Sequence, residues 1–290
     1  MKCVTYNIQY GIGLDGGYDI GRIVEAVRGA DVIALQEVTR NNPRNQGHDM
    51  VAEIREALPD YFAVYGPNFE IDVGSHLKDG KAVDVRFEFG NMILSKRPIV
   101  SSRNILLPRD RSFDHLNLQR GAVEALIDTP LGPVRFYSIH LDHRSPDERV
   151  RQLRFLMQRV LAYPQEGGAL TGLSEMGFPE PPLPEDFMLL GDFNMLPLSQ
   201  EYVELVGRID HEFGMPLVAS RPVDAAALLA TEGEPATTWV DPERPRDESR
   251  WKRIDYCFVS AGLAGKVKSS RVDGGAVGSD HLPVWFELAS

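Results

Sequence analysis

The sequence has few cysteines, no long apolar run, and fewer basic than acidic residues. Its only cysteines are Cys3 and Cys257. Each lies in an apolar run of strand length, so we expect two buried thiols and no disulfide, as in a reducing compartment. No apolar run approaches the roughly 20 residues that a membrane-spanning helix needs. No basic and then apolar leader precedes Lys2. These absences predict a cytoplasmic protein without a transmembrane segment.

The charge balance is acidic, with 31 Lys and Arg against 42 Asp and Glu, a formal net charge of −11. An overall field of this sign does not attract nucleic acids or anionic membranes. It argues against a protein that coats nucleic acid, and any phosphate chemistry would have to be local. The apolar content of 43% and charged content of 25% are typical of a globular protein large enough to bury a substantial core.

Short apolar runs bounded by turn residues predict strands along the whole chain. The predicted strands are Lys2–Ile8, Asp31–Gln36, Tyr61–Tyr65, Asn91–Leu94, Ala122–Ile127, Val134–His140, Phe187–Leu190, Ile254–Val259 and Pro283–Leu288. Amphipathic segments lie between several of these runs. Many strands with a few helices favour a layered α/β fold.

Two helices have recognisable start signals. One has apolar residues at helical spacing from Ile20 to Val27, with Asp19 as its cap and Gly29 as its stop. The other begins at Ser145, where Pro146 suits the first turn and Glu148 completes a capping box. Its buried stripe would be Val150, Leu153, Met157 and Val160, and its arginines, Arg144, Arg149, Arg151 and Arg154, would lie on a solvated face.

The segment 164–186 interrupts this alternation. Its 23 residues include five prolines, four glycines and five acids but no basic residue. Such a stretch is typical of a solvated surface excursion. The alternative is a lid over a site, because long loops without secondary structure in compact domains often have that function.

Polar residues stand at the ends of four predicted strands. The strings are TYN at Thr5–Asn7, LQE at Leu35–Glu37, GDFN at Gly191–Asn194 and SDH at Ser279–His281. Each alone is typical of a turn or cap. Together they predict a site, because ligands and catalytic groups gather at the carboxyl ends of strands in layered α/β sheets.

These residue types suit divalent-metal chemistry on phosphate. The candidates are the carboxylates of Glu37, Asp192, Asp255 and Asp280, the amides of Asn7 and Asn194, and the imidazoles of His140 and His281. Hard oxygen donors in an incomplete shell suit Mg²⁺ or Mn²⁺. A zinc pair from His140 and His143 is a weaker alternative. A divalent ion can neutralise phosphoryl charge and orient a water, while a histidine paired with an acid, as His281 with Asp255, has a fixed tautomer.

The ordered strings TYNI, LQEV, GNMILSKRP, YSIHLDH, GDFN, WKRIDYCFV and SDHLPV, over residues 5–284, resemble the endonuclease/exonuclease/phosphatase superfamily. That resemblance implies a single domain over 1–290, with 164–186 as an insertion. It implies a deoxyribonuclease I-like, four-layer α/β/β/α sandwich of two facing mixed β-sheets with helices on the outer faces. We also expect a metal site at one sheet edge and a monomeric enzyme.

The resemblance also implies a role for each matched residue. Glu37 would be the main metal ligand, with Asn7 beside the metal and Asp280 as a second ligand or histidine partner. Asp192 and Asn194 would orient or deprotonate the attacking water. His140 and His281 would contact the phosphate, with Asp255 supporting His281. Asn91 would lend a hydrogen bond to the phosphate. From its place beside Lys252 and Arg253, Trp251 is a candidate to line the substrate pocket.

The departures from the family pattern indicate a branch. The exonuclease III-like branch carries Asn or Asp and then Gly where this chain has Gln9 and Tyr10, so the sequence more closely resembles bacterial metal-dependent hydrolases. The leading hypothesis is a Mg²⁺-dependent phosphodiesterase or phosphatase acting on a small or lipid-derived phosphate ester. The alternatives are a nuclease acting on DNA or RNA, which the acidic charge disfavours, and a catalytically silent binding module on the same fold.

Overall fold

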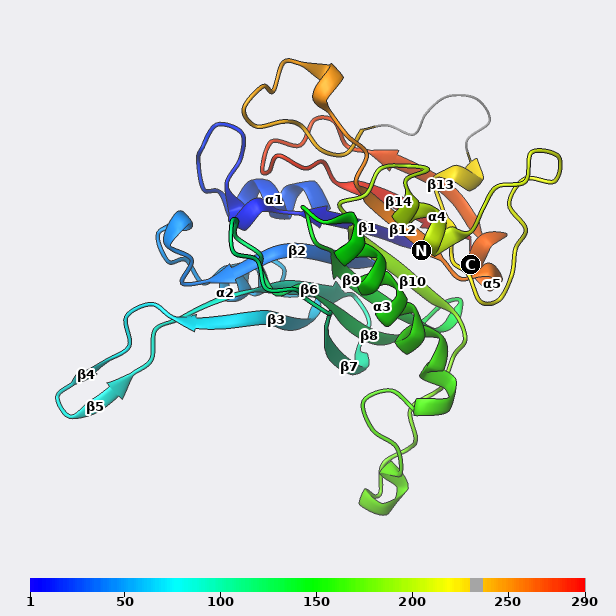
Figure 1. Ribbon diagram of the computed structural model, residues 1–290. Coiled ribbons are helices and arrows are strands. Elements are labelled where there is room, and N and C mark those ends of the chain that lie inside the picture. The colour runs from blue at the N-terminus through cyan, green and yellow to red at the C-terminus, as the bar shows by residue number, and fades with distance from the viewer. Residues whose placement is uncertain (230–236, 290) are drawn as a thin grey trace.

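The computed structural model describes residues 1–229 and 237–289 and contains two six-stranded sheets (Figure 1). The first sheet has the order β13 (Val267–Val272), β14 (Val284–Leu288), β1 (Lys2–Asn7), β2 (Val32–Arg40), β6 (Arg86–Ser95), β3 (Phe62–Asp72). The second has the order β11 (Val223–Asp224), β12 (Asp255–Val259), β10 (Phe187–Asp192), β9 (Gly132–His140), β8 (Gly121–Thr129), β7 (Ile99–Leu106). A small hairpin, β4 (His76–Lys78) and β5 (Lys81–Val83), extends from the body.

Each sheet has one parallel pair of strands at its centre. β1 runs parallel to β2 in the first sheet, and β9 runs parallel to β10 in the second, while all other pairings are antiparallel. Asn7, His140 and Asp192 are the last residues of three of these strands, and Glu37 lies within the fourth, β2. The two parallel pairs therefore explain why residues far apart in the sequence share one edge of the molecule.

Helices cover the outer face of each sheet. α1 (Ile20–Val27) and α2 (Met50–Ala57) pack on the first sheet, and α3 (Pro146–Glu166) and α4 (Gln200–Val206) pack on the second. A short α5 (Ala261–Ala264) follows β12. A third apolar cluster fills the space between the sheets. The predicted four-layer α/β/β/α sandwich is confirmed.

The two cysteines lie in the cluster between the sheets, as buried free thiols. Burial raises the pKa of the Cys3 thiol to about 12, so it stays protonated and behaves as a small apolar group. Among the described residues, no helix is both long and apolar enough to cross a membrane.

The strands are longer and more numerous than the sequence predicted. β2 continues past Gln36 to Arg40, and its pairing with β6 shifts register between Leu35 and Val38. β7 and β13 lie at sheet edges and have the alternating burial of strands with one solvated face. They were missed because their apolar residues are interrupted by Ser and Arg rather than forming a continuous run.

The start of α3 differs from the predicted capping box. Ser145 caps the helix, accepting from the backbone N–H of Glu148. The reciprocal bond is absent, because the N–H of Ser145 donates to Asp142 Oδ2 at 2.6 Å while Glu148 accepts from Asp110 and Asn117.

The expected solvated face of α3 also needs one correction. Arg149 is buried and donates to Glu201 Oε1 of α4 at 2.8 Å through Nε. Because a buried guanidinium needs an anion, Arg149 faces the neighbouring helix, whereas Arg151 and Arg154 are exposed as expected.

The predicted insertion begins inside a helix. Pro164 lies in the last turn of α3, which ends at Glu166 before the left-handed Gly167. Residues 167–186 then lead into Phe187, the first residue of β10, which pairs with Arg135 rather than with His140. The segment therefore enters β10 at the end of the strand that lies away from His140 and Asp192, and it extends from that end of the sheet (Figure 1). This position is incompatible with a lid over those residues.

Candidate active site

Asp192 is the centre of the polar cluster at the ends of the parallel strands. Its Oδ2 accepts from Asn7 Nδ2 at 3.0 Å and lies 3.4 Å from His140 Nε2 and 3.7 Å from His281 Nε2. Its Oδ1 accepts from the backbone N–H of Asn194 at 2.9 Å. One carboxylate thus contacts four of the residues that the sequence analysis selected.

Close packing of two strands explains why the GDFN motif begins with a glycine. Gly191 has a φ of 154°, and a Cβ at this position would lie 1.9 Å from the carbonyl oxygen of Ile139. No side chain fits there without moving a backbone strand. The glycine therefore lets β10 approach β9 closely just before Asp192.

Glu37 is directed to the site by a β-bulge. Its φ of 60° lies in the left-handed region, within the register shift of β2. Such bulges re-aim side chains beside functional sites. Its Oε1 accepts from Asn7 Nδ2 at 3.3 Å and lies 4.0 Å from His140 Nε2. A prediction of β2 ending at Gln36 could not have anticipated this geometry.

The surroundings of Glu37 fit a cation. Its side chain is only 17% exposed, and its Oε2 is buried with no hydrogen-bond partner among residues 1–229 and 237–289. Burial and the nearby negative charge of Asp280 raise the pKa of the Glu37 carboxyl. Two carboxylates that repel one another at a buried edge are hard oxygen donors of the kind that a divalent ion such as Mg²⁺ binds. Asn7 lies beside them with Nδ2 toward Glu37, while its Oδ1 accepts from the backbone N–H of Gln9 at 3.1 Å. One potential ligand atom each from Asp192, Asp255 and His281 also lie within 4.8 Å of one another.

His281 and Asp255 form a buried pair. His281 Nδ1 lies 2.9 Å from Asp255 Oδ2, which also accepts from Thr238 Oγ1 at 2.7 Å. Burial opposes a charge on the imidazole, but Asp255 and Asp192 raise the pKa of His281 well above its ordinary value. Because Nδ1 is engaged by Asp255, the Nε2–H of His281 is directed toward Asp192. Burial, assisted by Asp255 and opposed by His281, raises the pKa of Asp192 to about 7.

The three remaining predicted residues, Asn194, Asn91 and Trp251, differ in their hydrogen bonds. Asn194 has a left-handed φ of 50° and donates from Nδ2 to Leu141 O at 3.2 Å. Asn91 is fully buried and donates to Gly121 O at 2.8 Å, with its Oδ1 unpartnered. Trp251 forms no side-chain hydrogen bond within the described ranges, and its Nε1 is buried without a partner. Trp251 is therefore not joined to the cluster.

Two residues at the site were missed by the sequence analysis. Trp239 donates from Nε1 to Asp280 Oδ2 at 3.0 Å. Arg120 is buried and lies 2.7 Å from His140 Nε2 through Nη1. Trp239 carried no motif. Arg120 could have been noticed as a basic residue two positions before the predicted strand Ala122–Ile127, but only strand pairing places it beside His140.

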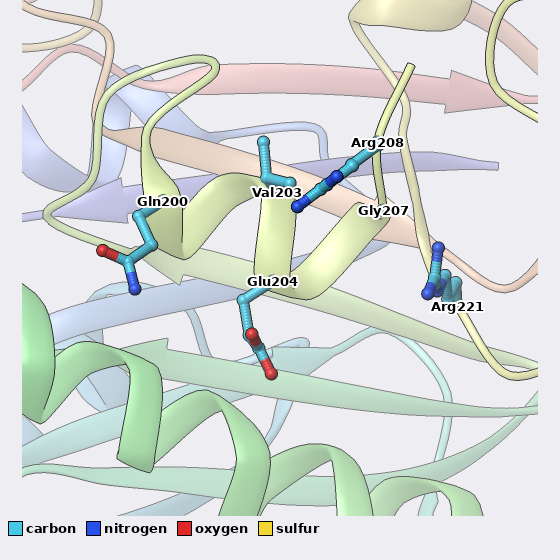
Figure 2. Close-up of a pocket in the computed structure, with 6 residues that line it drawn as sticks. All are labelled: Gln200, Val203, Glu204, Gly207, Arg208 and Arg221. Carbon is cyan, nitrogen blue, oxygen red and sulfur yellow. The ribbon is translucent and has the colours of Figure 1, made fainter. Parts of the chain in front are cut away.

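A separate hollow of about 610 Å³ lies beside α4 (Figure 2). It is lined by Gln200, Val203, Glu204, Gly207, Arg208 and Arg221. In Figure 2, Gln200 and Glu204 project from α4, and the two arginines come from the chain that follows it. None of these residues belongs to the cluster around Asp192.

Comparison with known proteins gives a consistent result. The profile of the Endonuclease/Exonuclease/phosphatase family matches residues 4–281, whereas no curated protein matches the chain. An endonuclease/exonuclease/phosphatase from Beutenbergia cavernae has a similar structure, with a TM-score of 0.69 and 22% identity over 100% of this chain and 72% of that one.

Two further solved structures carry more specific names. A 3′ phosphatase from Neisseria, bound to a product DNA hairpin, has a TM-score of 0.61 and 19% identity over 100% of both chains. A mannosyl-6-phosphatase from Bacteroides thetaiotaomicron has a TM-score of 0.60 and 19% identity over 100% of both chains. At such identities these likenesses show the fold.

Proposed function

The chain belongs to the endonuclease/exonuclease/phosphatase family, and from this we propose that it is a metal-dependent hydrolase of phosphate esters that uses water as the nucleophile. The observation that carries the proposal is the surroundings of Asp192. Its Oδ2 accepts from Asn7 Nδ2 and lies within 3.7 Å of the Nε2 atoms of His140 and His281 at one sheet edge. An acceptor carboxylate so placed is suited to orient and deprotonate a water that attacks phosphorus.

The residues of the site divide into two groups by chemistry. Asp192 and Asn194 hold the attacking water. His281, kept cationic by Asp255, stabilises the negative charge that develops on the phosphoryl oxygens. Because the pKa of Asp192 is raised to about 7, its carboxylate is a stronger base than an ordinary aspartate and can accept a proton near neutral pH.

Glu37, Asp280 and Asn7 would hold the metal, with Mg²⁺ as the proposed ion and Mn²⁺ as its substitute. The unpartnered Oε2 of Glu37 supports this assignment. The bound ion would neutralise phosphoryl charge and orient the substrate. Trp239 fixes Oδ2 of Asp280 through its indole N–H, while Oδ1 has only a longer contact of 3.3 Å from Ser279 Oγ.

We propose a small or lipid-derived phosphate ester as the substrate. The net charge of −11 disfavours a long polyanion that needs contacts along its backbone. A similarly folded protein named as a mannosyl-6-phosphatase is compatible with a compact substrate. A nuclease or DNA phosphatase is the second candidate, because another similarly folded protein is a 3′ phosphatase bound to DNA. A silent binding module is disfavoured because every expected site residue is present.

A panel of substrates assayed with Mg²⁺ and with EDTA tests the proposal. We expect hydrolysis of bis-p-nitrophenyl phosphate or of a phosphomonoester that is lost in EDTA, with plasmid DNA left intact. Rapid nicking of plasmid would instead favour the nuclease. Binding of phosphate esters without metal-dependent turnover would support the binding module.

A further inference from the structure

Arg120 is a buried cation within the proposed active site that the assigned roles do not use. It is 3% exposed and ends the segment that leads into β8, whose first residue, Gly121, pairs with His140. Its Nη1 lies 2.7 Å from His140 Nε2, and its Nη2 lies 2.9 Å from His143 Nδ1. Its Nε is buried and has no hydrogen-bond partner among the residues that the structure describes.

The partners of Arg120 differ from those of the other buried arginines. Arg149 pairs with Glu201, and Arg253 pairs with Asp224. Arg135 donates to the backbone carbonyls of Val160 and Glu185. Arg120 has no carboxylate within 4.0 Å in the described part of the chain and contacts two imidazoles instead. The negative charges of Glu37 and Asp192 lie near enough to favour its cation, but neither of them contacts the guanidinium. A buried cation whose donors reach no anion is costly, and an anion that arrives with the substrate would supply that contact.

The two imidazoles act as acceptors. An arginine side chain can only donate, so His140 Nε2 must present a lone pair to it. His143 lies between two arginines, with Nδ1 2.9 Å from Arg120 Nη2 and Nε2 3.1 Å from Arg144 Nε. A neutral imidazole has one acceptor nitrogen, and we assign it to Nδ1, which makes the shorter contact with the buried Arg120. Consistently, burial and the charge of Arg120 lower the pKa of both histidines, that of His143 to about 4. Neutral His140 therefore carries its proton on Nδ1, which is buried without a partner. In this arrangement Nε2 of His140 has no proton to give to a phosphate.

We propose that Arg120 is a catalytic residue that binds a non-bridging phosphoryl oxygen, and that His143 is a positioning residue that holds its guanidinium in place. This inference rests on the proposed function and moves the phosphate contact from His140 to Arg120. The guanidinium has five N–H donors, of which two are used by the imidazoles. The remaining donors can bind a tetrahedral anion through two bonds, as a lysine cannot.

The position of His143 supports its part in the proposal. It follows His140 by three residues, just beyond the end of β9, and accepts from the second terminal nitrogen of Arg120. With Nη1 and Nη2 both held, the plane of the guanidinium is fixed. Loss of the His143 acceptor would free the guanidinium to rotate, which should reduce turnover without removing the charge.

Binding of inorganic phosphate and turnover of bis-p-nitrophenyl phosphate, both with Mg²⁺, test Arg120. We expect Arg120→Ala to weaken phosphate binding by at least about tenfold and lower kcat by on the order of 10². Added guanidinium ion should restore part of kcat, which a purely structural role would not allow. Arg109→Ala, in the same segment but exposed, is the control and should behave as the wild type.

Further variants keep the test decisive if Arg120→Ala does not fold. Arg120→Lys keeps the charge but loses the two-bond geometry, so its kcat should fall by about tenfold or more. His143→Asn retains an acceptor and should keep most of the activity, whereas His143→Leu should lose it. A folded Arg120→Ala or Arg120→Lys protein with wild-type phosphate binding and kcat would overturn the inference.

The failure of this inference can be told apart from failure of the proposed function. If the wild type hydrolyses esters and Arg120→Ala binds phosphate normally, the inference is wrong and the proposed function stands. If the wild type hydrolyses no ester, the proposed function is wrong. Phosphate binding that depends on Arg120 would then still support its role as the anion-binding residue.

Discussion

Asn7 of the first sheet and Asp192 of the second are joined by a hydrogen bond of 3.0 Å from Nδ2 to Oδ2. The two residues are 185 positions apart in the sequence. The same amide nitrogen lies 3.3 Å from Glu37 Oε1. Asn7 therefore connects the proposed metal ligand to the proposed water-binding carboxylate, and the two sheets must pack correctly before the site exists.

Asp192→Asn should lower kcat by on the order of 10² or more while leaving the fold intact, because the amide is isosteric but cannot accept the proton of water. Steady-state kinetics together with a thermal unfolding curve check this. Asp210→Asn, at an exposed turn, serves as the matched control. A folded Asp192→Asn enzyme with near-normal kcat would remove Asp192 from the water-binding role.

Glu37→Gln should mainly raise the Mg²⁺ concentration needed for half-maximal activity, by about tenfold or more, because a charged oxygen ligand is replaced by a neutral one. Activity titrated with Mg²⁺ and direct calorimetric Mg²⁺ binding measure this. Glu70→Gln, exposed on β3, should leave the titration unchanged. A wild-type Mg²⁺ dependence in Glu37→Gln would exclude Glu37 from the ligand set.

Trp239→Phe should raise the Mg²⁺ requirement by a few fold, because the aromatic ring is kept while the hydrogen bond to Asp280 Oδ2 is lost. The same titration measures the effect. Trp251→Phe is the control, since no hydrogen bond joins that indole to a described site residue. Equal behaviour of the two variants would show that the indole N–H does not position Asp280.

The stability of the folded state should decrease as the pH falls from about 6.5 to 4. The pKa of His143 is lowered to about 4 in the fold, while an unfolded histidine titrates near 6.5. In this window the unfolded chain binds a proton that the folded chain does not, so acid favours unfolding. His143→Asn should reduce the loss by on the order of 1 kcal/mol, a value limited by solvent screening of this partly exposed side chain.

Urea unfolding at pH 7 and at pH 4.5 measures this difference. His140 is present in both proteins, so its own contribution cancels in the comparison. An identical loss of stability in the wild type and in His143→Asn would show that His143 is not held neutral beside Arg120.

Replacing residues 168–183 with a short Gly/Ser linker should leave substrate preference and kcat within about twofold of the wild type. The segment joins the end of α3 to the start of β10, at the edge opposite Asp192. Activity on both a small ester and a larger lipid-derived ester tests this. A change in the ratio of the two activities would show that the segment reaches the substrate.

The sequence predicted helix starts and site residues correctly where a local pattern of residues matches a known chemical role. Asp19 and Ser145 were recognised as helix caps because a short polar side chain before an amphipathic run has few other uses. Asn7, His140 and Asp192 meet at one edge because each ends a central strand. The bulge at Glu37 was not foreseen, since it depends on pairing of β2 with β6.

The strand-end motifs and the residue types of the site were determined by the sequence alone, because they follow from apolar runs that stop at acids, amides and histidines. Only the tertiary structure decided the partners of those residues. It placed Arg120 between two imidazoles, Trp239 on Asp280, and the segment 167–186 at the far edge. The physical reason is that contacts across strands and sheets depend on register and packing. They join residues from 20 positions apart, as Arg120 and His140, to 185 apart, as Asn7 and Asp192, and leave no local pattern.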